Sequence, residues 1–227
     1  MPVRQNKLFR GWLVRLVLWL PPLFVAWWWL GLTEEVLHGL SILAAMSLPV
    51  LFNQSISEIL RQENQSWMVL TKLVIEHSDP SSLVVMVVSK EKLLHMIFGF
   101  PFLWGILLAT PGKRARRIIW GTLLLVAISL IGIATDLWAS LAVIINHQAS
   151  FIDEDVVPPP FRVSASPYPQ WLLHLSSFAR YLSILIVPMI APVLIWAILC
   201  PRSIIRLLMS LRWRMRVQNS GAASIWR

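Results

Sequence analysis

The chain has 227 residues, 57% of them hydrophobic and 14% charged, which excludes an ordinary cytosolic protein. Soluble globular proteins carry about 25% charged residues, so the surplus of Leu, Ile, Val and Trp is expected to contact lipid. The single cysteine, Cys200, excludes an intramolecular disulfide and a multi-cysteine metal cluster. A net charge of +9 would indicate nucleic acid in a soluble protein, but in a membrane protein the position of the charges decides their meaning.

The first predicted element, residues 1–32, is a basic start followed by an apolar run at 16–32. About 20 apolar residues cross a hydrocarbon core of about 30 Å, so this run predicts a transmembrane helix. Trp27-Trp28-Trp29 and then Glu34-Glu35 follow without a small-residue cleavage site, which favours an uncleaved signal anchor. The three tryptophans are typical of an interfacial aromatic belt, or they pack inside a helix bundle.

Residues 33–92 are too many for a connection and predict a small extracytoplasmic module. Its first part, 36–61, is expected to be a helix against the outer membrane surface or a neighbouring subunit. The alternative, a fifth span over 36–52, is disfavoured because this run contains Pro49 and because a crossing would place the later basic turn outside.

Two runs rich in β-branched residues, 67–76 and 83–89, flank an Asp-Pro turn signal and predict a β-hairpin over 67–89. An isolated hairpin is marginal in water, so it should pack on the preceding helix or pair with another protein. The segment 83–88 is almost entirely apolar, which suggests that both of its faces are covered.

Three further spans are predicted at 93–111, 118–146 and 171–200. The loop 112–117 between the first two is basic and marks the cytoplasmic side. Most of the 20 Lys and Arg residues lie in this loop, the amino end and the tail 201–227, where acidic residues are absent. Both termini are therefore expected in the cytoplasm, and the acidic segments 33–92 and 147–170 outside. The fold class is an all-α integral membrane protein with four transmembrane helices and a small extracytoplasmic α+β module.

Two ionisable residues near the outer ends of the third and fourth spans, Asp136 and Arg180, are expected at similar depth. Such a pair would be a partly desolvated Arg–carboxylate contact between helices, although a catalytic or conducting role is also open. His95, His147 and His174 lack the short spacing of metal ligands, so no metal or cofactor is predicted.

Several residues are expected to face partners or lipid. The segment 147–170, with three successive prolines, presents an extended edge or acts as a stiff linker. The tail reads as an amphipathic helix on anionic lipid, and nucleic acid is not an expected partner. The partner-facing surface is predicted to include Trp67, Val69, Val85, Val87, Pro159 and Tyr168, and the membrane-surface basic residues to include Arg114, Arg116, Arg117, Arg206, Arg212 and Arg214.

The first span carries Leu-Trp-Leu-Pro-Pro-Leu-Phe at 18–24 before the three tryptophans, the turn 111–117 is basic, and the last span has Pro188 and Pro192 within 181–196. In these features the chain resembles the exosortase H-associated membrane proteins. Exosortases are bacterial inner-membrane, cysteine transpeptidase-like enzymes that process proteins with a carboxy-terminal sorting tag, and the associated proteins are encoded beside them. The resemblance implies an inner-membrane protein with an exosortase-like partner, but supplies no role for it.

The chain does not look like an exosortase itself, because Cys200 and Arg180 are about 30 Å apart along one helix and cannot share a site. The leading hypothesis is a non-catalytic accessory subunit that holds or presents substrate to the sorting enzyme at the outer face. A small membrane enzyme acting at that face, or a permease subunit, are the alternatives.

Overall fold

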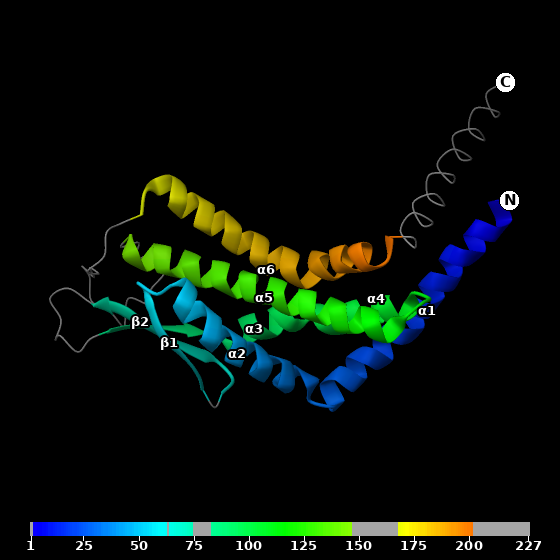
Figure 1. Cartoon of the computed structure of the whole chain (residues 1–227), viewed down its shortest axis with the longest axis horizontal. Helices are drawn as coiled ribbons and strands as arrows, with labels where there is room; N and C mark the ends of the chain where they lie inside the picture. Colours follow the sequence, from blue (N-terminus) through cyan, green and yellow to red (C-terminus); the bar gives the residue numbers. More distant parts are fainter. Residues whose placement is uncertain (1, 63, 75–82, 147–167, 202–227) are drawn as a thin grey trace, which may run out of the picture. The chain divides into compact units, whose positions relative to one another are not determined.

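The computed structural model describes residues 2–62, 64–74, 83–146 and 168–201 (Figure 1). These residues form two compact units, one from residues up to 30, 100–125 and from 191 onward, the other from 31–99 and 126–190. Two long helices contribute to both units. The elements in chain order are α1 (Pro2–Trp29), α2 (Leu32–Leu51), β1 (Ile56–Arg61), β2 (Trp67–Val74), β3 (Leu83–Val88), α3 (Lys90–Ile97), α4 (Gly99–Ala109), α5 (Arg114–Ile145) and α6 (Gln170–Leu199).

The first unit is built from α1, α4 and parts of α5 and α6, joined by aromatic contacts. Trp27 stacks on Phe100, with ring centroids 6.1 Å apart, and meets Trp104 edge-on at 5.3 Å. Such ring pairs add about 0.5–1.5 kcal/mol to the burial of their area. Trp27 is buried whereas Trp28 and Trp29 are exposed. Of the three tryptophans, one therefore packs within the helices, and the interfacial belt stays a prediction for the other two.

Leucine side chains of neighbouring helices pack against Gly121 in α5 of the first unit. A Cβ added there would lie 3.0 Å from Leu107 Cδ1 and 3.4 Å from Leu199 Cδ1. Small residues are enriched at transmembrane helix contacts, where van der Waals packing drives association. Gly31, by contrast, serves conformation: its φ of 65° is left-handed, a conformation that glycine adopts readily, and it lies between the end of α1 and the start of α2.

The second unit contains an antiparallel sheet in the order β1-β2-β3, with α2 packed against β1 (Figure 1). The predicted hairpin is confirmed in its two strands, which pair in the register Trp67↔Val88 and Val69↔Met86. Its turn, 75–82, lies outside the described residues. Buried residues of β2 and β3 alternate with less buried ones along each strand, as expected for a sheet with one covered face.

The first strand corrects the sequence-based expectation, since Ile56–Arg61 is a strand and not the end of a helix. The helix-like spacing of its buried residues comes from a register shift between Ile56 and Glu58. This irregularity interrupts the two-residue alternation, so that Ile56 and Ile59 are both buried. Apolar residues three apart in the sequence are also the pattern of a helix face, and the sequence did not distinguish the two.

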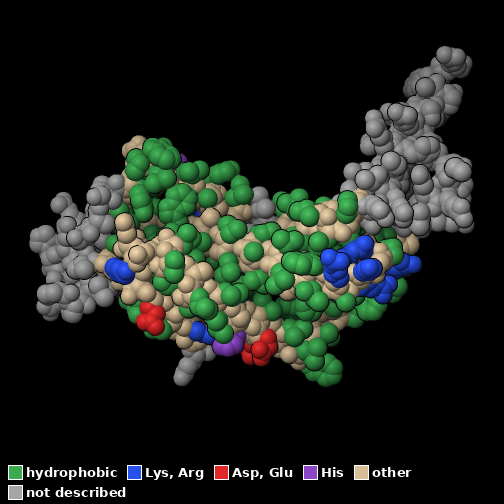
Figure 2. All heavy atoms as spheres, viewed as in Figure 1, with side chains coloured by type: hydrophobic (Ala, Val, Ile, Leu, Met, Phe, Trp, Pro, Cys, Tyr) green, Lys and Arg blue, Asp and Glu red, His purple; other side chains and the backbone are tan. Residues whose placement is uncertain are grey.

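Four helical stretches of the described chain are long and apolar enough to cross a membrane: Arg10–Trp29, Leu32–Leu51, Lys90–Ala109 and Arg114–Ile145. The number matches the expectation but the membership differs. Helix α2, expected at the membrane surface, meets the requirement, whereas α6 meets it only as two parts, Gln170–Leu185 and Pro188–Leu199, with a bend between them. Pro188 and Pro192 explain such a bend, because proline removes a backbone hydrogen bond within a helix. Figure 2 shows hydrophobic side chains spread over the visible face, as a lipid-facing surface requires.

Candidate functional site

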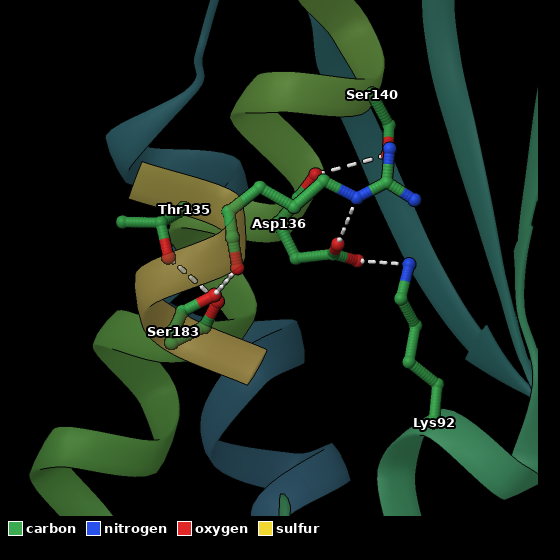
Figure 3. A network of polar contacts seen from close by, with 7 residues as sticks. Lys92, Thr135, Asp136, Ser140 and Ser183 are labelled. Carbon is green, nitrogen blue, oxygen red and sulfur yellow. Dashed lines mark hydrogen bonds and ion pairs between the residues drawn. The ribbon is translucent and has the colours of Figure 1, made fainter. Parts of the chain in front are cut away.

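The second unit holds a charged cluster centred on Asp136, a residue of α5. Lys92 Nζ in α3 lies 2.7 Å from Asp136 Oδ2, and Arg180 Nε in α6 lies 3.1 Å from Asp136 Oδ1. Figure 3 shows the Lys92 side chain reaching the Asp136 carboxylate. Three helices far apart in sequence thus meet at one carboxylate.

Burial differs sharply among the three side chains. The Asp136 side chain is 3% exposed, whereas Lys92 and Arg180 are 26% and 38% exposed. A carboxylate taken out of water requires compensation by cations and hydrogen bonds, which explains two cations on one acid. Asp136 Oδ1 nevertheless accepts no hydrogen bond from the described residues, so its contact with Arg180 is an ion pair without an aligned N–H.

Serine hydroxyls donate hydrogen bonds to backbone carbonyl oxygens of the cluster residues. Ser140 Oγ donates to the Asp136 carbonyl oxygen at 2.9 Å, and Ser183 Oγ donates to that of Arg180 at 2.8 Å. Figure 3 shows both serines around the ion pairs. These bonds stay within one helix each, whereas the two ion pairs join α5 to α3 and to α6.

Sequence reasoning brought Asp136 and Arg180 to the same depth but missed Lys92. That residue was counted with the outer module because it precedes the second apolar run. The candidate span observed in the structure begins at Lys90, so Lys92 belongs to its first turns. One sequence signal could have indicated this contact. Lys92 directly precedes the second predicted span, and the next span contains a single carboxylate, Asp136.

A second candidate surface is the uncovered face of the sheet. Two cross-strand rows run across it, Leu60–Met68–Val87 and Glu58–Leu70–Val85. Leu60, Val85 and Val87 are 41%, 46% and 62% exposed. The expectation that both faces of β3 are covered is therefore not met within the described chain.

Two residues expected on this surface, Trp67 and Val69, lie instead on the opposite face and are fully buried. The strand alternation places them there, because Trp67 pairs with Val88 and Val69 with Met86, both buried. The Trp67 indole Nε1 is buried and has no hydrogen-bond partner among the described residues. The exposed apolar surface is thus formed by Leu60, Val85 and Val87, with Met68 and Leu70 half-buried between them.

The ends of the proline-rich segment are tied together. The Asn146 side-chain amide donates to the Tyr168 carbonyl oxygen at 2.8 Å and accepts from the Tyr168 backbone N–H at 2.9 Å. This pair of bonds imitates a strand pairing and joins the end of α5 to the residues before α6. Pro159, and with it the expected partner-facing edge, lies outside the described residues.

The basic turn 111–117 of the first unit includes the first residues of α5. Its Arg114 and Arg116 are exposed, and its Arg117 is half-buried. Arg117 Nη1 donates to the Pro111 carbonyl oxygen at 2.9 Å. The guanidinium passes Gly112 so closely that a Cβ there would lie 2.7 Å from Nη1. The expected lipid-facing residues Arg206, Arg212 and Arg214 lie outside the described residues.

The remaining chemical candidates stay apart from the cluster's ion pairs. His95 and His174 are exposed, and His147 lies outside the described residues. Cys200 is free and buried. Within the described ranges, no group of three or more His, Cys, Asp or Glu residues could hold a metal ion.

The family model for exosortase H-associated membrane proteins matches residues 6–203. The chain therefore belongs to this family, and the resemblance noted in its sequence is confirmed. No curated protein and no solved structure matches the chain.

Proposed function

We propose that this exosortase H-associated membrane protein is a non-catalytic accessory subunit that binds an exosortase-like enzyme through the uncovered face of its sheet. It holds or presents the tagged substrate to that enzyme on the extracytoplasmic side of the inner membrane. Membership of the family supports the association with an exosortase system. The exposed side chains of Leu60, Val85 and Val87 are the observation that carries the docking role.

The edge strand β3 favours a protein partner over water. Natural sheets usually protect an exposed edge strand with charged residues or proline. The sequence of β3, Leu-Val-Val-Met-Val-Val, contains neither. Within the described sheet, β3 pairs only with β2. An added strand from a partner would satisfy its outer backbone groups, and the side chains of Val85 and Val87 would then contact that partner.

Co-purification with the exosortase tests the proposal. Val85→Lys combined with Val87→Lys places two charges on the exposed apolar surface, and recovery of the enzyme should fall by at least about tenfold, as for loss of an interface hot spot. Val85→Thr combined with Val87→Thr is the matched control, because threonine keeps the β-branched shape and should retain most of the complex. Both variants should express and unfold like the native chain, since the two side chains are exposed. Unchanged recovery with the lysine variant would contradict docking at this face.

The non-catalytic role has its own test. His95→Ala and His174→Ala remove two exposed histidines of the described chain, and processing of a tagged substrate should continue at the native rate in the assembled complex. Loss of processing by either variant, with complex and substrate capture intact, would support the alternative of an enzyme at the outer face.

A further inference from the structure

The Asp136 cluster carries more positive than negative charge. Lys92 and Arg180 both contact the one carboxylate, so the three side chains together have a net charge of one positive unit. No other described acidic side chain forms an ion pair with either cation. An unbalanced positive charge near the membrane interface attracts an anion.

The unused hydrogen-bonding capacity lies on Arg180. Its Nε faces Asp136, while Nη1 and Nη2 have no hydrogen-bond or ion-pair partner in the described part of the chain. The guanidinium is fixed by a buried carboxylate on one side and is 38% exposed overall. Its two terminal amines form the fork that binds two oxygens of a phosphate.

The depth of the cluster matches that of a lipid headgroup. Helix α5 begins at the basic turn with Arg114. From Ile118, the first apolar residue after that turn, Asp136 is about 27 Å along the helix at the usual rise per residue. This is close to the hydrocarbon thickness of about 30 Å. The cluster therefore falls near the membrane interface opposite to the basic turn.

Helix α6 exposes apolar side chains at the depth of Arg180. Phe178, Tyr181 and Leu185 on the same helix are 63%, 68% and 63% exposed. Acyl chains of the surrounding lipid can lie on such side chains at the depth of the guanidinium. A soluble anion would gain nothing from that lipid, so the surroundings favour a lipid as the source of the phosphate.

We propose that Arg180 and Lys92, positioned by Asp136, bind the phosphate of an anionic phospholipid. Arg180 supplies the two terminal amines, Lys92 adds a second positive charge, and Asp136 holds both in place. The site does not depend on the docking function proposed above, because no residue of the sheet takes part in it.

Native mass spectrometry of the full chain in detergent, titrated with phosphatidylglycerol, tests this site. Arg180→Gln should weaken binding about tenfold, the usual effect of losing a charge-assisted bidentate contact. The matched control is Arg61→Gln, which removes the same charge from an exposed arginine of β1 and should change binding less than about twofold. Equal effects of the two variants would overturn the site.

Asp136→Asn separates a positioned site from simple attraction by charge. It raises the positive charge of the cluster, so nonspecific attraction predicts tighter binding. The proposal predicts weaker binding, because the guanidinium loses its anchor. Tighter binding by this variant would therefore contradict the proposal. Arg180→Lys keeps the charge and the partner of Asp136 and should bind with intermediate affinity, which keeps the test valid where Arg180→Gln fails to fold.

Two further ligands identify the source of the phosphate. Diacylglycerol with the same acyl chains lacks the phosphate and should bind native and Arg180→Gln chains equally. Soluble glycerol phosphate should not displace phosphatidylglycerol at equal concentration. Displacement would show that a free phosphate is sufficient, and would overturn the assignment to a lipid.

Discussion

Lys92 Nζ lies 2.7 Å from Asp136 Oδ2 although the two residues belong to different candidate membrane spans. The lysine side chain is about one quarter exposed and the aspartate is buried. This asymmetry determines which partner the cluster tolerates losing, because an exposed lysine can turn to water whereas the carboxylate cannot.

Asp136→Asn should therefore destabilise the protein more than Lys92→Gln does. The first change leaves two cations without their partner and should lower the free energy of unfolding by about 2 kcal/mol. The second leaves Arg180 to compensate and should cost about 1 kcal/mol. Unfolding in mixed detergent micelles measures both.

Glu58→Gln is the control for this comparison, because it removes an exposed carboxylate that has no ion pair among the described residues. Its effect should stay within about 0.5 kcal/mol. A larger loss for Lys92→Gln than for Asp136→Asn would refute the compensation by Arg180.

Thr110 joins three helices of the first unit through one hydroxyl. Its Oγ1 accepts hydrogen bonds from the indole nitrogens of Trp196 at 2.9 Å and Trp12 at 3.3 Å, and the two indoles stack at 5.5 Å. Thr110→Val removes this buried acceptor and should cost about 2 kcal/mol in the free energy of unfolding, because a buried donor then loses its partner. Thermal unfolding followed by tryptophan fluorescence reports the change.

Thr135→Val provides the comparison, since the Thr135 hydroxyl donates to the carbonyl oxygen of Gly132 in its own helix. It should have little effect, and Thr110→Ser should retain most of the stability. If the two valine variants unfold alike, the hydroxyl of Thr110 does not join the helices as argued.

Two helical glycines should respond oppositely to alanine. A Cβ at Gly121 would be crowded by Leu107, whereas one at Gly39 would meet nothing within 4 Å. Gly121→Ala should lower the unfolding free energy by about 1 kcal/mol through overpacking. Gly39→Ala should raise it by up to about 1 kcal/mol through helix propensity. Unfolding curves of both variants are compared with that of the native chain in the same detergent. Shifts in the same direction would contradict the packing around Gly121 in α5.

The proposed orientation can be tested by thiol labelling in a Cys200→Ser background. Ser57→Cys lies on the exposed side of β1 and Ala115→Cys lies in the exposed basic turn. Because basic turns remain in the cytoplasm, an impermeant maleimide should label position 57 in cells with an intact inner membrane. Position 115 should react only after that membrane is opened. The reverse pattern would invert the topology and remove the extracytoplasmic docking role.

The sequence was sufficient where a property depends on composition or local spacing. The apolar runs identified most of the spans, and β-branched residues around an Asp-Pro turn identified the strands β2 and β3. Asp136 and Arg180 could be placed at one depth because a helix advances by a constant rise per residue. Each of these inferences uses residues close together in the chain, or one regular geometry.

Only the tertiary structure decided which side chains meet and which are covered. Pairing with β2 made the segment of Ile56 and Ile59 a strand despite its helix-like spacing, and strand pairing placed Trp67 inside and Val87 outside. Lys92 forms an ion pair with Asp136 because the fold brings the start of α3 close to α5. Burial and contact depend on the partners that a segment finds across the fold, and a one-dimensional pattern fixes the possible faces of an element without fixing those partners.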